Sequence, residues 1–326
     1  MAAGFDLKYG EYKKGNLSDD EMWSALAYLF SSKSVNDTSY KFGFLKAILD
    51  NLYNVDNNLT LNFNQLFSKF TEVYWNLVLK HGIRQKKIVK DGRISSLEGI
   101  LFDAQERYGL ERGIPYESLS LEMISDITHK VKQKCKQNVV GALYADLQEC
   151  LYSFDKKAET LTFNPVMYEF VCKHKVAIEK LNYYEWARFL EKVNKDDVMD
   201  HLLSKIDESS KRNNLKYYRN ILFEEFESKC FYCHKDVSAD AVAVDHFIPW
   251  SFIKDDNLWN FVLACPKCNS SKSDKLADNR FLDLLVKRND FILVEKHTEM
   301  KTYSADRLLK IYEFAMANGY DSWKRF

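Results

Sequence analysis

Apolar residues recur every three or four positions through the first two hundred residues, which is the pattern of helices that bury one face. The clearest such face is formed by Phe63, Leu66, Phe67, Phe70, Val73, Tyr74, Leu77 and Val78. Gly82 follows this face and is the residue type that most readily ends a helix. We therefore predict a long helix over residues 63–78.

Capping signals and apolar spacing predict further helices in the same part of the chain. Ser18 and Glu21 have the spacing of a capping box, and Asn164 before Pro165 is a second helix start. Apolar periodicity predicts other helices near residues 40–52, 96–108, 120–137 and 139–153. Residues 1–212 are thus expected to form one helical domain.

The apolar pattern breaks at residues 207–214, which are polar and mark the expected domain boundary. A second domain, residues 213–326, is then expected. It begins with a short basic amphipathic helix from Lys216. Its core, residues 228–280, contains two apolar runs suited to a hairpin, 241–244 and 260–264, and a helix is expected over 270–280. Two more helices are expected after it, over 281–288 and 305–316.

The composition is that of an ordinary globular protein, with 46% hydrophobic and 29% charged residues. No apolar run approaches the roughly 20 residues that cross a bilayer, and the first residues lack the basic start and apolar core of a secretory signal. We therefore expect a cytoplasmic protein with no membrane partner.

Net charge is zero, with 47 basic and 47 acidic residues, so any phosphate-binding surface must be a local patch. The densest basic stretch covers residues 80–93. A solvated loop is the favoured interpretation of this stretch, because charge runs usually lie on the surface. A phosphate contact is the alternative.

Four of the seven cysteines form two Cys-x-x-Cys pairs, Cys230 with Cys233 and Cys265 with Cys268. In a reducing compartment such pairs are more often metal ligands than disulfides. Four thiolates are a preferred closed set for structural Zn²⁺. The 31 residues between Cys233 and Cys265 exceed the spacing of a zinc ribbon, so a folded segment is expected between the two pairs.

Several polar residues have a defined spacing around the second pair. An Asp-His-x-x-Pro run starts at Asp245, Asn260 follows the histidine by fourteen residues, and Asn269 and Lys272 form Asn-x-x-Lys directly after the second pair. This combination resembles the HNH endonuclease family, which has a ββα-metal fold and a four-cysteine zinc site. Similar spacing occurs in the HNH subdomain of RNA-guided CRISPR nucleases. The resemblance covers residues 216–285 and leaves the helical domain unassigned.

The resemblance implies a role for each of these positions. Asp245 and Asn269 would hold one divalent ion, Mg²⁺ or Mn²⁺, through hard oxygen ligands. His246 would be the general base that takes a proton from the attacking water. Asn260 would brace the loop and orient His246, and Lys272 would contact the scissile phosphate. Asparagine rather than histidine at position 269 favours an oxygen-preferring metal.

The implied function is metal-dependent DNA hydrolysis, as an effector in bacterial defence against phage or foreign DNA. The helical domain would supply targeting, an interface for a partner protein, or autoinhibition. Two alternatives stay open: the same chemistry on RNA, and a zinc-containing module that binds nucleic acid or protein without catalysis. Between Lys229 and Arg280 seven basic residues balance seven acidic ones, so the nuclease core is expected to need help in binding DNA.

Overall fold

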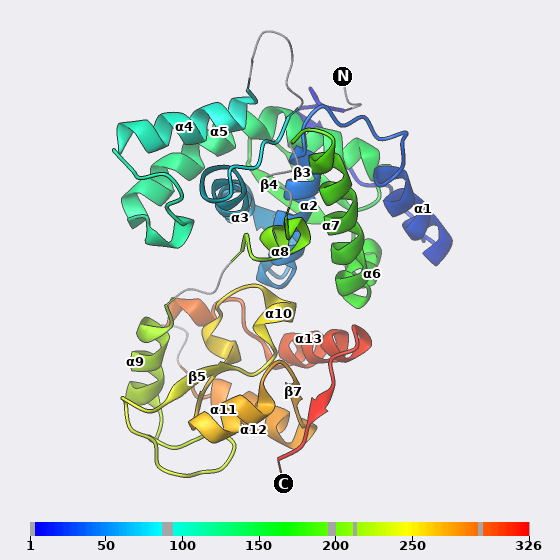
Figure 1. Cartoon of the computed structure of the whole chain (residues 1–326). Helices are drawn as coiled ribbons and strands as arrows, with labels where there is room; N and C mark the ends of the chain where they lie inside the picture. The colour runs from blue at the N-terminus through cyan, green and yellow to red at the C-terminus, as the bar shows by residue number, and fades with distance from the viewer. Residues whose placement is uncertain (1–3, 87–93, 195–199, 211–213, 293–295, 326) are drawn as a thin grey trace. The chain divides into compact units, whose positions relative to one another are not determined.

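The computed structural model describes residues 4–86, 94–194, 200–210, 214–292 and 296–325. The chain divides into two compact units, Met1–Lys211 and Arg212–Phe326. Helices predominate in both (Figure 1), which confirms the predicted mainly α fold. Residues 87–93 of the basic stretch, and residues 211–213 of the expected boundary, lie outside the described residues.

The first unit is built from eight helices among its described residues. They are α1 (Asp19–Leu29), α2 (Tyr40–Asp50), α3 (Phe63–Trp75), α4 (Ser96–Arg107), α5 (Leu121–Asp146), α6 (Pro165–Lys173), α7 (Lys175–Glu191) and α8 (Leu202–Asp207). Helices α2, α3 and α5 pack on one another and form the centre of the core. Gly43 makes this packing possible, because a Cβ there would lie 2.4 Å from the hydroxyl oxygen of Tyr74.

The predicted helix starts follow from capping side chains. Ser18 and Glu21 form the expected capping box at α1, and Asn62 with Gln65 forms another at α3. Helix α3 continues into a π-helical turn over Asn76–Lys80, and Gly82 follows with a positive φ of 67°. The long apolar face predicted over residues 63–78 is therefore helical along its whole length.

A four-stranded antiparallel sheet in this unit was not predicted. Its strands are β1 (Tyr9–Gly10), β2 (Thr60–Asn62), β3 (Tyr152–Asp155) and β4 (Thr160–Phe163), in the order β1-β3-β4-β2. The sequence predicted two helices here, 120–137 and 139–153. This prediction is wrong, because α5 is a single helix that continues to Asp146. Gln148 and Glu149 both have positive φ, which ends helical geometry, and β3 begins at Tyr152.

The second unit contains short strands and five helices among its described residues. They are α9 (Lys216–Glu225), β5 (Ala243–His246), α10 (Trp250–Ile253), β6 (Phe261–Ala264), α11 (Pro266–Lys272), β7 (Leu276–Ala277), α12 (Asn279–Asn289), α13 (Ala305–Ala317) and β8 (Ser322–Trp323). Strand β5 pairs antiparallel with β6 in a register that places His246 opposite Phe261, and α11 packs on β5. This is the ββα arrangement implied by the resemblance.

The helix expected over residues 270–280 is misplaced in the prediction. It begins earlier, at Pro266, since proline fits the first turn of a helix and Cys265 lies at the N-cap. It ends at Lys272, because Ser273 has a φ of 48°. Strand β7 then pairs parallel with β8 near the end of the chain.

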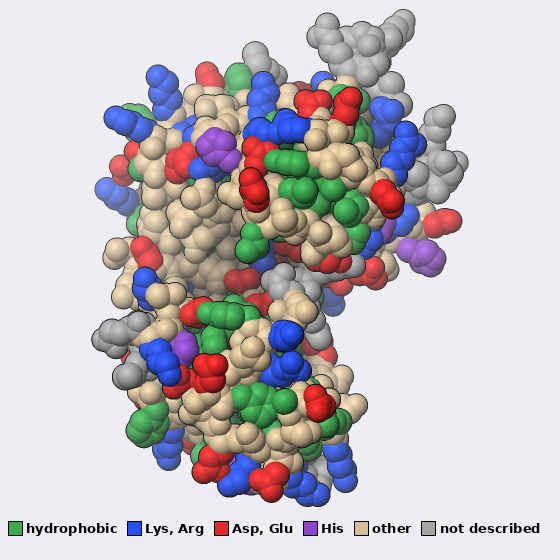
Figure 2. Space-filling view, turned by 90° about the vertical axis from the view of Figure 1, so that its left-hand side faces the viewer, with side chains coloured by type: hydrophobic (Ala, Val, Ile, Leu, Met, Phe, Trp, Pro, Cys, Tyr) green, Lys and Arg blue, Asp and Glu red, His purple; other side chains and the backbone are tan. Residues whose placement is uncertain are grey.

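Charged side chains are mixed over the surface. On the face drawn in Figure 2, basic and acidic side chains of the described residues alternate over both units. Among the described residues, no helix combines the length and apolar character that a bilayer span requires.

Candidate metal centres and active site

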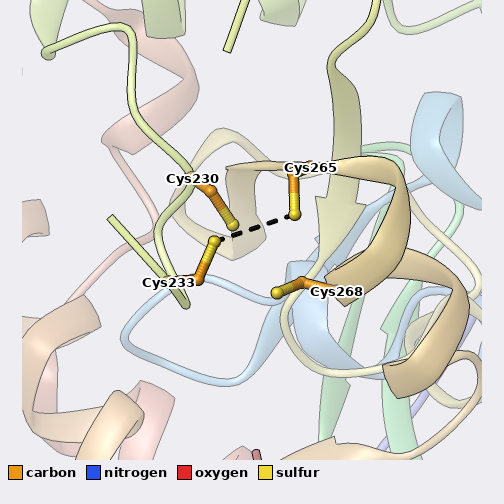
Figure 3. Close-up of side chains that lie close together, drawn as sticks. All are labelled: Cys230, Cys233, Cys265 and Cys268. Carbon is orange, nitrogen blue, oxygen red and sulfur yellow. Dashed lines mark hydrogen bonds between the residues drawn. The ribbon is translucent and has the colours of Figure 1, made fainter. Parts of the chain in front are cut away.

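The four paired cysteines come together at one point of the second unit. Their Sγ atoms all lie within 4.8 Å of one another, and Figure 3 shows the four thiol groups turned toward a common centre. The Sγ atoms of Cys233 and Cys265 are 3.8 Å apart. A tetrahedral zinc with Zn–S bonds of about 2.3 Å separates its sulfurs by about 3.8 Å, so the cluster is compatible with Zn²⁺.

The backbone around the hairpin brings the two pairs together. The amide of Phe231 donates to the carbonyl of Leu263 on β6 at 2.8 Å, which joins the first pair to the strand that precedes the second. Burial raises the pKa of the Cys230 thiol. Burial acts in the same direction on Cys265, but hydrogen bonds from the Cys268 backbone and from neighbouring thiols outweigh it and lower the pKa to about 7. One thiolate is thus available near neutral pH, as metal binding requires.

Asp245 lies on β5 and is buried together with two side chains that donate to it. The Tyr232 hydroxyl donates to Oδ2 of Asp245 at 2.6 Å, and Nζ of Lys272 lies 3.1 Å from the same oxygen. Tyr232 belongs to the loop between the first two cysteines, and Lys272 ends helix α11. The carboxylate is therefore held from both sides of the ββα unit.

Lys272 is fully buried beside the carboxylate of Asp245. Besides Asp245, its ammonium group donates to the carbonyl of His246 at 2.8 Å. A buried cation with a carboxylate partner is costly to expose, and the phosphate contact expected of Lys272 stays a prediction. Lys272 thus joins two adjacent residues of β5, Asp245 and His246, to helix α11.

His246 is the last residue of β5, and a carboxylate holds its ring. Its Nε2 lies 2.9 Å from Oδ1 of Asp256, and both side chains are more than 90% buried. An ionised carboxylate only accepts hydrogen bonds, so Nε2 carries the proton in this pair. The ring of Phe261 packs edge-on against His246 at 4.7 Å.

Asp256 and Tyr232 were not predicted as parts of the site. Asp256 belongs to the loop between α10 and β6, and its carbonyl accepts from the Tyr218 hydroxyl of α9 at 3.1 Å. The sequence offers one signal for Asp256, the pair Asp255-Asp256 between the predicted base and Asn260. The two adjacent carboxylates are equivalent in the sequence, so the pair does not show which of them contacts His246.

Asn260 is fully buried and holds the loop that follows His246. Its Oδ1 accepts from the amide of Ile248 at 2.8 Å, and its Nδ2 donates to the carbonyl of the same residue at 2.9 Å. Its own carbonyl accepts from the amide of Phe247 at 2.7 Å. These bonds correspond to the loop-bracing position that the resemblance implies.

Asn269 lies half-buried on α11, the helix that packs on the strand carrying Asp245. A carboxylate and an amide carbonyl are hard oxygen donors that suit Mg²⁺ better than a soft metal. Among the described residues, the four cysteines are the only group of three or more His, Cys, Asp or Glu side chains whose ligand atoms lie close enough together to hold one metal ion. The expectation that Asp245 and Asn269 hold a second ion stays a prediction.

Comparison with known proteins places one family on this region. The model of an HNH endonuclease family matches residues 230–277, from the first cysteine of the cluster to the end of β7. No curated protein and no solved structure matches the chain. The matched segment contains the four cysteines and the hairpin with Asp245, His246 and Asn260. Residues 230–277 of this chain are therefore similar to the HNH endonuclease family.

Proposed function

We propose that the chain is a metal-dependent endonuclease that hydrolyses DNA phosphodiester bonds with His246 as the general base. The observation that carries the proposal is the hydrogen bond of 2.9 Å between Nε2 of His246 and Asp256, next to Asp245 on β5. A structural zinc module has no need for a buried histidine held by a carboxylate beside a second carboxylate.

The Asp256 contact determines which nitrogen of His246 can act as base. Because Nε2 donates to Asp256, Nδ1 keeps its lone pair and is the nitrogen that can accept a proton from a water molecule. The negative charge of Asp256 favours the imidazolium that forms when this proton is taken. Asp256 is thus a positioning residue in the proposal, and His246 is the catalytic residue.

Asp245 and Asn269 are the proposed ligands of a catalytic Mg²⁺ or Mn²⁺. Such an ion, when bound, neutralises charge on the scissile phosphate. Lys272 and Tyr232 orient the Asp245 carboxylate by donating to it. Asn260 keeps the loop after His246 in place through its paired hydrogen bonds with Ile248.

DNA is the proposed substrate, and the helical unit is the proposed source of targeting, partner binding or control. The balanced charge of residues 229–280 supports a need for such help. The wider role we propose is defence against phage or foreign DNA, which rests on the settings in which HNH modules occur. Phage plating on bacteria that express the wild-type chain or its His246→Ala variant tests that role.

The substrate is tested by incubating the purified chain with supercoiled DNA, linear DNA and single-stranded RNA. Each substrate is combined with Mg²⁺, Mn²⁺ or chelator. The proposal expects nicked or linear plasmid with a divalent ion and intact plasmid without one. Cleavage restricted to RNA would favour the RNA-directed alternative. Binding with no cleavage under any metal would favour the non-catalytic module.

A further inference from the structure

A cavity of about 300 Å³ lies within the first unit, far along the chain from the HNH segment. It is bordered by the loop before α2, by the start of α2 and α4, and by the middle of α5. Helices α4 and α5 lie side by side (Figure 1), and α2 also packs on α5. The volume is at the lower end of the range for small-molecule sites, which is about 300–1,000 Å³.

The lining of the cavity includes basic side chains. Lys86 and Lys134 border the cavity, and neither forms an ion pair within the described parts of the chain. Lys41 also borders it, but its ammonium group is buried against Asp146 and donates to the carbonyl of Val35 at 2.8 Å. Asp37 is the one carboxylate among the lining residues and is exposed. If Lys41 is counted as neutralised by Asp146, the two other lysines and Asp37 leave the lining with a net charge of +1.

The other groups of the lining are uncharged near pH 7. Burial raises the pKa of the Cys135 thiol to about 12, and burial also raises the pKa of the Tyr40 hydroxyl well above its usual range. Together with Val139 and Ala142 these side chains give the cavity an apolar wall. An aromatic ring beside aliphatic groups suits a flat heterocycle.

Asn36 borders the cavity with a polar atom that lacks a partner. Its Nδ2 donates to the carbonyl of Ser34 at 3.3 Å, which fixes the orientation of the amide. Its Oδ1 is buried and accepts no hydrogen bond within the described residues. A buried acceptor without a donor is unfavourable. This oxygen has almost no accessible surface, so a ligand N–H group would reach it only after the Asn36 side chain turned.

The backbone of Lys86, on the rim of the cavity, is held in place before any ligand arrives. Lys86 follows Gln85, whose amide donates to Oε1 of Glu98 at 2.9 Å and whose side-chain oxygen accepts from the Ser39 hydroxyl at 2.6 Å. Lys86 also bridges Thr38 by backbone pairing. A preformed rim reduces the conformational entropy lost on binding.

From these contacts we infer that the cavity binds a nucleoside monophosphate. Lys86 and Lys134 contact the phosphate, and the base lies against Tyr40 and the aliphatic wall. Lys86 belongs to the basic stretch of residues 80–93. The inference gives this residue a phosphate contact, which was the alternative to a solvated loop for that stretch.

The test is calorimetric titration of the full chain with AMP, GMP and inorganic phosphate, at low ionic strength and without added divalent ions. Binding of at least one nucleotide is expected, with inorganic phosphate at least tenfold weaker. Lys86→Met and Lys134→Met should each weaken the nucleotide roughly tenfold, the loss typical of a charged hydrogen bond. Lys33→Met is the matched control, since Lys33 is exposed and outside the lining.

Three results would overturn the inference. They are the absence of binding by either nucleotide at millimolar concentration, equal affinity for inorganic phosphate and nucleotide, and nucleotide binding that the double variant of Lys86 and Lys134 leaves unchanged. The last result would place the nucleotide elsewhere, including the HNH segment. Because both lysines lie outside the HNH segment and the readout is binding, the inference stands or falls separately from the nuclease proposal.

Discussion

At the residue scale, the site depends on buried polar side chains that hold one another in place. Asp256 fixes the ring of His246, and Lys272 with Tyr232 fixes the carboxylate of Asp245. The sequence singled out Asp245, His246 and Asn260 because their spacing resembles that of the HNH family. It did not identify Asp256 or the burial of Lys272, because both depend on contacts between residues that the chain brings together only on folding.

Replacing Asp256 with Asn tests its positioning role. The variant keeps the size of the side chain but loses the charge that favours the imidazolium, and its amide can turn a donor toward Nε2. In the Ser-His-Asp arrangement, the same change of the carboxylate that orients the catalytic histidine lowers kcat about 10⁴-fold. We expect kcat for plasmid cleavage to fall by this amount with KM nearly unchanged. A variant with wild-type kcat would remove Asp256 from the account.

Replacing Lys272 with Met tests whether this lysine has a structural role. The variant leaves Asp245 buried beside Tyr232 without its cation, a change that typically costs about 3–5 kcal/mol. We expect the free energy of unfolding of the second unit to fall by that order in a denaturant titration. Lys275→Met is the control, because Lys275 is exposed in the same segment. Equal stability of the two variants would contradict a structural role for Lys272.

At the element scale, long helices were predictable and short strands were not. Helix α3 has 13 residues and presents six of the eight predicted apolar positions, whereas each strand of the first unit has two to four residues. So few residues contain too few periods to distinguish alternation from helical spacing. The helix α11 was misplaced for a related reason, since its start depends on the cysteine N-cap and on Pro266.

Glu159 joins the turn between β3 and β4 to helix α5, and its contribution should depend on pH. Its carboxylate pairs with Lys132 and Lys136, each at 2.5 Å. Burial acts to raise the pKa of Glu159, but the hydrogen bonds from both lysines outweigh burial and lower the pKa. A lowered pKa means that the carboxylate stabilises the fold above its unfolded pKa of about 4.3, and that this stability is lost as pH falls through the folded value.

We therefore expect Glu159→Gln to reduce the free energy of unfolding by about 1–3 kcal/mol at pH 7. The difference from wild type should shrink once the pH falls below about 4. Glu11→Gln is the control, because Glu11 and Lys14 form a pair 3.8 Å apart in which both side chains are at least 75% exposed. A difference that persists unchanged at pH 3 would contradict the ion-pair explanation.

At the scale of the whole molecule, the chain combines two units with separate cores. The family match and the cysteine cluster both lie in the second. The first unit has a large aromatic core, including Phe44, Phe67 and Phe70. Sequence reasoning assigned the second unit because paired cysteines and spaced polar residues carry chemistry. For the first unit the sequence predicted helices alone, because apolar periodicity indicates which side chains are buried and does not indicate which ligands are bound.

This separation predicts that chelation acts on one unit. Removing zinc leaves four thiols without their ion, and a small domain with a structural zinc loses much of its stability with the metal. We expect calorimetric unfolding to show two transitions, of which only one shifts to lower temperature with a strong chelator. Cys268→Ser should reproduce that shift without chelator. A simultaneous shift of both transitions would contradict independent cores.

The central claim is that His246 is the base of a metal-dependent nuclease. The most direct measurement is the rate at which supercoiled plasmid is nicked by wild type and by His246→Ala, with Mg²⁺ and with equal zinc content confirmed. His129→Ala, an exposed histidine of the first unit, is the control. The account predicts wild-type rates for the control and a loss of at least about 100-fold for His246→Ala. Equal cleavage by wild type and His246→Ala would contradict it.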